Sequence, residues 1–496
     1  NQGSAAVLQA PPGAGKTTRV PPALLSEPWL EGRRIVMLEP RRLAARAAAL
    51  RMADQMSEPV GRTVGYRVRM DTRVGPETRI EVVTEGVLTR MLQGDPGLSG
   101  VGLVIFDEFH ERHLESDLGL ALCLDLQGIL NPDLRLLVMS ATLDPAPVAG
   151  LLGGAPVIAC EGRQHPVETR YLGRDRQRAL EAAAAEAVLA AARSEAGSIL
   201  VFLPGAAEIR RVLARLSSAD LPGEWLLAPL FGNLSKEEQD QAIAPAPAGR
   251  RKIVLATNIA ETSLTIEGIR VVVDGGFMRV PRFDVRSGMT RLATVPVSRA
   301  SADQRRGRAG RTEPGVCYRI WAEAAHGMLA ERNRPEILQA DLAALVLELA
   351  IWGVEDPARL KWLDPPPEAA CLQARALLKD LGALGERGQA TEHGRRMAEL
   401  PLHPRLAHML LEAQRRGLGA EACDLAAVLS ERDFVKFPPG EADSDVGLRL
   451  EVMAGPGAGP NAAAARFTVD RPALRRCRRV AEALRQRLGL SSRPAP

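Results

Sequence analysis

The sequence predicts an α/β protein in which two successive strand–helix units precede a mostly α-helical C-terminal region. Three observations support this fold class. An apolar strand ends in a glycine-rich turn near residue 13, strands and helices alternate again from about residue 168, and from about residue 328 apolar residues recur with the period of a helix. The 496 residues are sufficient for several hydrophobic cores.

The first unit begins with the apolar stretch AAVLQA, which runs directly into a glycine-rich turn. The turn consists of Gly13, Ala14, Gly15, Lys16, Thr17 and Thr18. A turn of this kind wraps a phosphate with its backbone amides at the start of a helix. We therefore expect Lys16 to pair with the β- and γ-phosphates of a nucleotide and Thr17 to bind Mg²⁺. The strict Walker A pattern has glycine at the position of Ala10, and a chance GKT in a loop is the alternative.

Two carboxylates follow the next informative strand, LVIF, which ends at residue 106. The carboxyl ends of strands in an α/β sheet converge on the ligand crevice, so we expect Asp107 to hold Mg²⁺ through water and Glu108 to orient or deprotonate an attacking water. An ordinary helix start would also favour carboxylates here. His110 and His113 are spaced i and i+3, whereas the HExxH zinc motif requires i and i+4, which argues against a zinc site.

The second unit places the strand SILVFLPG, residues 198–205, between helical stretches at 178–195 and 206–216. It lacks a GKT of its own, and it carries SADQRRGRAGRT at 301–312 instead. Arginines at i and i+3 share one helix face, so Arg308 and Arg311 are predicted to reach a γ-phosphate bound by the first unit. Such arginine fingers contribute roughly 10³ to 10⁵ in turnover in phosphoryl transfer. A solvated basic helix or an RNA-binding patch is the alternative.

A hairpin and several helices are expected in the remainder. Residues 280–298 alternate in polarity and turn at Ser287–Gly288, which is typical of a β-hairpin. Helical patterns occupy 337–354, 368–384 and 391–413. Residues 474–490 form a basic amphipathic pattern, which either contacts RNA or is a solvated face. The glycine- and alanine-rich stretch 454–466 is expected to be a flexible loop.

Composition narrows the class of protein. The net charge is +4 and nearly all basic residues are arginine. This mild basic excess permits a nucleic-acid partner, and a GC-rich genome is an equally good explanation of the arginine content. Neither an apolar run of about 18 residues nor a signal-peptide pattern occurs, so we expect no membrane association and a cytoplasmic location. The cysteines form no CxxC pair and are expected to be buried small hydrophobes. They are Cys123, Cys160, Cys317, Cys371, Cys423 and Cys477.

Seven motifs in order carry a family resemblance. They are GAGKTT (13–18), EPRR (39–42), TEG (84–86), DEFH (107–110), SAT (140–142), ATNIAETSLTI (256–266) and QRRGRAGR (304–311). Together they resemble the DEAH-box/RHA helicases of superfamily 2. With Phe109 in the DEFH motif, the sequence resembles the bacterial HrpB-type branch in particular.

The resemblance implies two RecA-like P-loop domains that bind ATP in their cleft, followed by a winged-helix domain and a helical bundle. On this pattern the boundaries fall at 1–167, 168–327, 328–395 and 396–496, with the β-hairpin at 277–298 in the second domain. The family uses such a hairpin as a wedge near the duplex fork, although a plain extension of the sheet is the alternative here.

The resemblance also implies roles for individual residues. Glu108 activates water, Gln304 positions it, and Arg308 and Arg311 are the fingers. Three residues couple hydrolysis to movement, namely His110, Ser140 and Thr142. The donors suited to phosphate and sugar contacts are Arg41, Arg42 and Thr84 in the first domain and Thr257 and Asn258 in the second.

Nucleotide selectivity is expected to be loose. Arg51 matches the family's adenine-stacking arginine, but Ile243 stands where the second domain of the family has an aromatic residue. Weak base stacking would admit other NTPs beside ATP.

The expected function is therefore ATP-dependent helicase activity with 3′-to-5′ movement on single-stranded RNA or on a tailed RNA duplex, with DNA as a further substrate. The alternative is a nucleotide-gated RNA or ribonucleoprotein clamp that remodels its target without processive unwinding.

Overall fold

The computed structural model describes residues 3–490 except 12, 69–70, 163–164, 174–177, 233, 263–265, 285–286, 439 and 456–466. The chain divides into two compact units, one of residues Asn1–Ala340 with Leu360–Pro366 and one of Asp341–Arg359 with Pro367–Pro496. The division between these units falls at Ala340, so the boundary predicted at 328 lies inside the first unit. Most of the predicted flexible loop at 454–466 lies outside the described residues.

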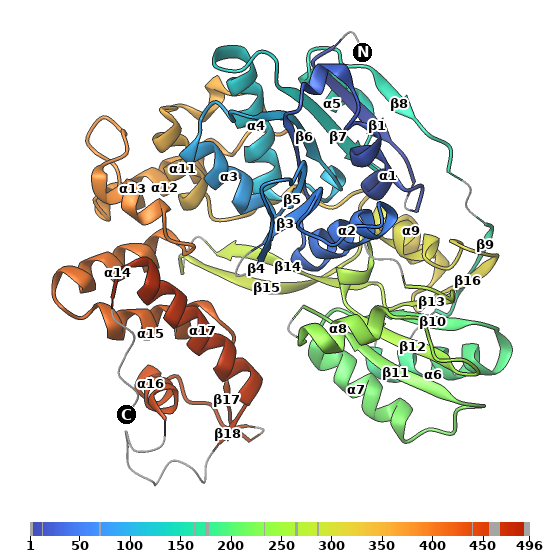
Figure 1. The fold of residues 1–496 in the computed structure, drawn as a ribbon. Coiled ribbons are helices and arrows are strands. Elements are labelled where there is room, and N and C mark those ends of the chain that lie inside the picture. The colour runs from blue at the N-terminus through green and yellow to red at the C-terminus, as the bar shows by residue number, and fades with distance from the viewer. Residues whose placement is uncertain are drawn as a thin grey trace. The chain divides into compact units, whose positions relative to one another are not determined.

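The first unit contains an eight-stranded sheet with the strand order β4-β3-β5-β2-β6-β7-β1-β8. Every neighbouring pair is parallel except β3 with β4. The strands are β1 (Ala5–Gln9), β2 (Arg34–Leu38), β3 (Val64–Val68), β4 (Asp71–Arg73), β5 (Ile80–Val83), β6 (Val101–Phe106), β7 (Arg135–Ser140) and β8 (Val157–Ala159). The helices associated with this sheet are α1 (Lys16–Ala23), α2 (Arg42–Gln55), α3 (Glu85–Gly94), α4 (Leu114–Ile129) and α5 (Pro145–Leu151) (Figure 1).

Both faces of the central strands are buried, as parallel sheets require. On one face Ala49 and Met52 of α2 pack in the same cluster as Met37 of β2. On the other face α4 approaches β2 and β6 closely, because a Cβ placed on Gly119 would lie 3.4 Å from the ring of Phe106 and 3.1 Å from Leu88 of α3. Glycine at this position therefore lets α4 lie against the strands whose ends carry the predicted chemistry.

The second sheet has six strands in the order β11-β12-β10-β13-β16-β9, and all neighbours are parallel. Its strands are β9 (Val167–Tyr171), β10 (Ser198–Phe202), β11 (Trp225–Leu230), β12 (Arg251–Ala256), β13 (Ile269–Asp274) and β16 (Gly315–Arg319). Its helices are α6 (Leu180–Ser194), α7 (Ala206–Ser217), α8 (Lys236–Ile243), α9 (Arg299–Gly307) and α10 (Glu323–Gly327). Two α/β sheets in tandem confirm the predicted fold class.

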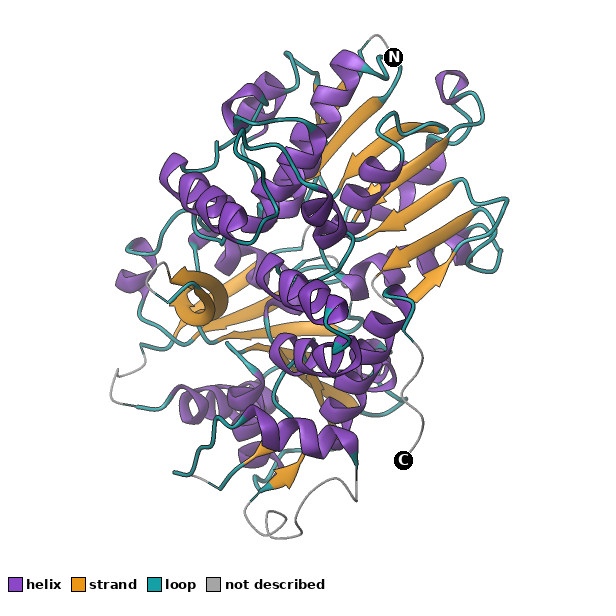
Figure 2. Ribbon diagram, turned by 90° about the vertical axis from the view of Figure 1, so that its left-hand side faces the viewer, coloured by secondary structure: helices purple, strands orange, loops and turns teal. Residues whose placement is uncertain are grey.

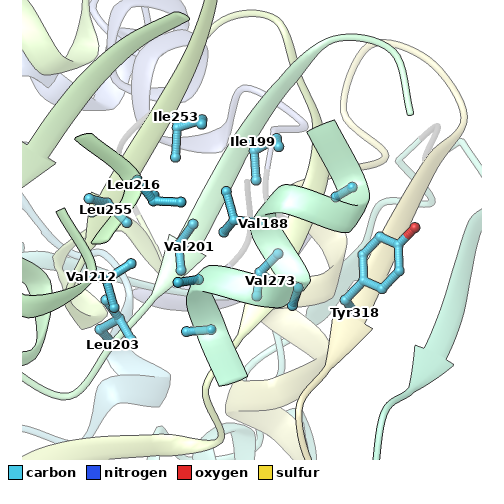
Figure 3. Packing of buried hydrophobic residues seen from close by; sticks show 14 of the residues in the cluster. Val188, Ile199, Val201, Leu203, Val212, Leu216, Ile253, Leu255, Val273 and Tyr318 are labelled. Atoms are coloured by element: carbon cyan, nitrogen blue, oxygen red, sulfur yellow. The ribbon is translucent and has the colours of Figure 1, made fainter. Parts of the chain in front are cut away.

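The core of the second domain lies between this sheet and helices α6 and α7. Val201, Ile253 and Val273 from three adjacent strands meet Val188 of α6 and Val212 of α7 (Figure 3). The alanine-rich sequence of α6 has a structural reason, because small side chains on its buried face allow the helix to lie close to the sheet.

A two-stranded hairpin leaves this domain. Strands β14 (Phe277–Asp284) and β15 (Met289–Pro296) pair antiparallel over the stretch predicted as a hairpin (Figure 2). Its outer part is exposed, with Met289 and Leu292 more than half accessible to solvent.

The compact unit formed by Asp341–Arg359 and Pro367–Pro496 is mostly helical, as predicted for the C-terminal region. Its helices are α11 (Ala343–Trp352), α12 (Glu368–Asp380), α13 (Glu392–Ala398), α14 (Pro404–Arg415), α15 (Gly419–Ser430), α16 (Val446–Ala454) and α17 (Arg471–Arg487). A single antiparallel bridge joins Leu384 to Ala390 between α12 and α13, and strands β17 (Val435–Lys436) and β18 (Thr468–Val469) form a short ladder. The basic pattern predicted at 474–490 falls largely within α17.

All six cysteines are free thiols, and five of them are buried as expected. Cys160 is exposed, so the prediction that all six are buried is wrong for this residue. It lies one residue beyond the end of β8, an edge strand whose residues are themselves exposed. Within the described part of the chain, no helix is long and apolar enough to cross a membrane.

Candidate nucleotide site

The glycine-rich turn lies between the end of β1 and the start of α1. Gly13 has φ of 88° and Gly15 has φ of 84°, a left-handed conformation that glycine adopts without steric cost. Gly15 is the N-cap of α1, and Lys16 is its first residue. The exposed backbone amides at this helix start, together with the helix dipole, favour a bound phosphate.

The two carboxylates of DEFH lie at the same edge of the sheet as this turn, because β7 pairs in parallel with both β1 and β6. The Nζ of Lys16 lies 3.0 Å from Oε1 of Glu108 and 3.5 Å from Oδ1 of Asp107. The Thr17 hydroxyl donates a hydrogen bond to Oδ2 of Asp107. The residues predicted to bind phosphate, bind Mg²⁺ and activate water are therefore in direct contact.

Phe109 is buried between these groups and the core. Its ring meets that of Phe106 edge to face, with 6.3 Å between the ring centroids. Arg112 lies over the same ring at 5.7 Å. Phe109 therefore anchors the turn that directly follows Asp107 and Glu108.

Three buried carboxyl groups, Glu39, Asp107 and Glu108, crowd around the ammonium of Lys16. Burial opposes ionisation of Glu108, but Lys16 and His110 hold the pKa of this carboxyl at about 2, so it is ionised at neutral pH. Glu39, at the end of β2, is completely buried beside Asp107, and burial together with its two acidic neighbours raises its pKa well above the usual range. The Thr17 hydroxyl and the Asp107 carboxylate, which are in contact, would hold a divalent cation. Hydroxyl and carboxylate oxygens are ligands suited to Mg²⁺.

Gln304 and Arg311 of the second domain reach the first, whereas Arg308 bonds to its own domain. The side-chain nitrogen of Gln304 lies 2.6 Å from Nε2 of His110 and 3.4 Å from the Thr142 hydroxyl. Arg308 is buried and donates from Nε to the carbonyl of Glu261 at 2.9 Å. Arg311 lines the same cavity as Glu108 and the glycine-rich turn.

The two arginines are held in an environment that disfavours their charge. Burial lowers the pKa of Arg311 to about 10. Burial and the like charge of Arg311 lower the pKa of Arg308 well below its usual value. A bound anion between the two domains would relieve both effects, as expected for groups that stabilise a phosphate.

The cavity between these groups has a volume of about 520 Å³. Its far end is lined by Ala47, Ala48, Arg51 and Gln55 of α2, with Ile243 and Glu267 from the second domain. The predicted pair of Arg51 and Ile243 thus lines one pocket together with the phosphate cradle.

Comparison with known proteins agrees with this geometry. Residues 1–149 match the DEAD/DEAH box helicase family, residues 181–313 the helicase conserved C-terminal domain, and residues 374–402 the winged-helix helicase associated domain HA2. The chain is 53% identical over 443 residues to the ATP-dependent RNA helicase HrpB of Escherichia coli K12, which covers 89% of this chain and 54% of the relative. These matches support a helicase of the DEAH-box, HrpB type.

Solved structures lead to the same family. A crystal structure of the Escherichia coli DEAH/RHA helicase HrpB superposes with a TM-score of 0.85 at 48% identity and covers 99% of this chain and 59% of that one. A crystal structure of the E. coli DExH-box NTPase HrpB gives a TM-score of 0.81 at 48% identity, with 99% and 57% covered. The chain thus spans somewhat more than half the length of these relatives.

The residues predicted to contact nucleic acid differ in their exposure. Arg42 is exposed at the start of α2, while Thr84, Thr257 and Asn258 are half-buried. Arg41 is half-buried, and its guanidinium donates to the carbonyl of Asn258 and to Glu111. Their role in binding RNA stays a prediction.

Ser140 is buried, and its hydroxyl accepts a hydrogen bond from the amide of Leu143, which fixes the turn that presents Thr142. Sequence reasoning overlooked three further residues of the site region, Glu39, Glu111 and Thr262. Each lies in or beside a recognised motif, and Glu39 directly follows a buried strand, which is the signal that identified Asp107.

Proposed function

We propose that this DEAH-box helicase hydrolyses ATP with Mg²⁺ and uses the reaction to move 3′ to 5′ along single-stranded RNA, where it unwinds or remodels RNA structures. The proposal rests on one observation above all. Glu108 of the first domain and Arg311 of the second line one cavity with the glycine-rich turn, which supports phosphoryl transfer to water at this place.

The reaction follows from the positions of these side chains. Lys16 exchanges its contact with Glu108 for the β- and γ-phosphates, which frees that carboxylate to accept a proton from the attacking water. Thr17 and Asp107 would hold Mg²⁺, which neutralises phosphate charge when bound. Arg308 and Arg311 stabilise the charge on the transferred phosphoryl group.

Movement requires that the two domains change their contact during the cycle. Gln304 meets His110 and Thr142 directly, so the segment with the arginines is linked to the turn with Glu108 and to the SAT segment. Loss of the γ-phosphate would remove the anion that holds Arg308 and Arg311 against the first domain. A strand gripped by Arg41, Arg42 and Thr84 on one side and by Thr257 and Asn258 on the other would then be stepped along.

RNA is proposed as the nucleic acid because the relative with 53% identity is named an ATP-dependent RNA helicase. DNA as a further substrate, other NTPs beside ATP and a cytoplasmic location stay predictions. The absence of an aromatic residue at Ile243 favours loose base selectivity, because the aliphatic side chain offers no ring for stacking.

The test is a strand-displacement assay with RNA and DNA duplexes that carry a 3′ or a 5′ single-stranded tail, run with ATP and with a non-hydrolysable analogue. We expect displacement of 3′-tailed RNA duplexes with ATP only. Displacement from 5′ tails alone would contradict the polarity. Release with the analogue as efficient as with ATP would favour the nucleotide-gated clamp.

A further inference from the structure

Glu111 joins the two RecA-like domains in a way that the chemistry of the nucleotide site does not require. It is the last residue of η2 (Phe109–Glu111), the short 3-10 turn that follows Glu108. Its side chain is buried, with 9% of its surface exposed. One carboxylate oxygen accepts a hydrogen bond from the hydroxyl of Thr262 in the second domain. The other lies 2.9 Å from Nη2 of Arg41 and 2.9 Å from Nε2 of His113.

Arg41 provides a second link to the same segment of the second domain. While its Nη2 pairs with Glu111, its Nη1 donates to the carbonyl oxygen of Asn258. Asn258 and Thr262 lie just after β12, on either side of the end of η3 (Asn258–Ala260). The second domain thus contacts the pair of Glu111 and Arg41 at two points four residues apart in its sequence.

The turn that ends at Glu111 has a strained backbone. Glu108 before it has φ of 50° and Arg112 after it has φ of 53°, and neither is glycine. Side chains with a Cβ adopt this left-handed conformation only where surrounding contacts impose it. On the side of Arg112 these contacts come from the guanidinium, which pairs with both oxygens of Asp117 at 3.1 Å and with Asp364 at 2.7 Å.

The geometry of this turn controls the catalytic groups, since it includes His110 and is preceded directly by Glu108. Both contact other parts of the site, Glu108 through Lys16 and His110 through Gln304. We propose that Glu111 is a positioning residue. When the second domain contacts the turn, the hydrogen bond from Thr262 to Glu111 holds Glu108 in the geometry for water activation. This inference rests on the proposed ATP hydrolysis.

The proposal predicts a separation between turnover and binding. The Glu111 carboxylate does not line the nucleotide cavity, so loss of its contact with Thr262 leaves the phosphate cradle intact. The turn would relax toward a less strained backbone and misplace Glu108. We therefore expect the effect in kcat, with little change in the KM for ATP.

The test compares Thr262→Val, Thr262→Ser, Glu111→Ala and the double variant Glu111→Ala/Thr262→Val in RNA-stimulated ATP turnover by the whole chain. Thr262→Val removes the hydroxyl at constant shape and is expected to lower kcat roughly tenfold or more, as befits a buried hydrogen bond to a charged group. The KM should stay within about twofold, and Thr262→Ser should retain turnover near that of the unaltered chain. The double variant should lose no more than Glu111→Ala alone, because both changes remove the same hydrogen bond.

Asp240→Asn is the matched control. Asp240 of α8 pairs with Arg46 of α2 at 2.9 Å, so it also joins the two domains, but it is half exposed and lies away from the turn. The rate of RNA-stimulated ATP turnover by Asp240→Asn should equal that of the unaltered chain. An equal loss in Asp240→Asn would show that Thr262 acts only through adhesion between domains, and this would overturn the inference.

Two further outcomes separate the inference from the function on which it rests. If the unaltered chain hydrolyses ATP and Thr262→Val keeps kcat within twofold, the inference is wrong and the proposed function stands. If the unaltered chain shows no ATP turnover with RNA, the proposed function fails and the inference fails with it. Additive losses in the double variant would also contradict a shared link.

Discussion

The two α/β domains share one scaffold and differ in the residues at the carboxyl ends of their strands. In the first, the strand ends bring Lys16, Asp107 and Glu108 into mutual contact around a cradle of backbone amides. In the second, the turn after β10 has the sequence Leu203-Pro204-Gly205 and offers no lysine or hydroxyl for a phosphate. The comparison supports the proposal in which the first domain binds the nucleotide and the second completes the groups for hydrolysis.

Arginines of the second domain show the same division on a smaller scale. Arg305 is almost completely buried and pairs within its own domain with Glu261 and Asp274, both at 2.9 Å. Arg311, six residues later, lines the nucleotide cavity. One residue holds the domain together and the other serves the neighbouring domain, although both belong to a single motif.

The largest effect is expected from Arg311→Ala. Turnover of ATP should fall by roughly 10³ to 10⁵, because the residue stabilises charge on the transferred phosphoryl group. The nucleotide should still bind, since the cradle belongs to the first domain. Steady-state hydrolysis together with binding of a fluorescent ATP analogue measures both quantities.

Arg306→Ala is the control for this change. Arg306 neighbours the same turn, but its side chain is 43% exposed and lies 3.8 Å from the carboxylate of Asp303. Turnover in Arg306→Ala should remain near that of the unaltered chain. Comparable losses in both variants would mean that the motif as a whole, and not a finger directed at the nucleotide, supports hydrolysis.

A smaller effect, and one on stability, is expected from Arg305→Met. The change leaves Glu261 and Asp274 buried without their cationic partner, which costs about 3 to 5 kcal/mol. The unfolding transition of the second domain should shift to lower temperature in scanning calorimetry. Arg306→Met, which breaks only an exposed pair, should cost about 1 kcal/mol or less. Equal stability of the two variants would contradict the structural role of the buried Arg305 pairs.

Much of the fold could be predicted from the sequence, because each major strand is a short apolar run with a polar or glycine-rich stretch at its end. The same regularity located Lys16, Asp107 and Glu108, since parallel strands bring their carboxyl ends to one edge. The i and i+3 spacing predicted that Arg308 and Arg311 share a helix face, but α9 ends at Gly307 and both lie beyond it. Arg311 nevertheless lines the cavity with the glycine-rich turn.

The contacts between domains could not be predicted from local pattern. Glu111 resembles any acidic residue of a charged turn, and its partners Arg41 and Thr262 lie 70 and 151 residues away in the sequence. The exposed position of Cys160 was missed for a related reason, because exposure beside an edge strand depends on what covers that edge. Local sequence specifies the elements, whereas these features depend on the packing of distant segments.

The measurement that tests the account most directly is ATP binding beside single-turnover hydrolysis in Glu108→Gln. The amide cannot accept a proton from water, so hydrolysis should fall by roughly 10² to 10⁴ while ATP affinity is retained. Glu224→Gln, which alters an exposed carboxylate of the second domain, should behave as the unaltered chain. Undiminished hydrolysis in Glu108→Gln would contradict the assignment of this carboxylate as the group that activates water.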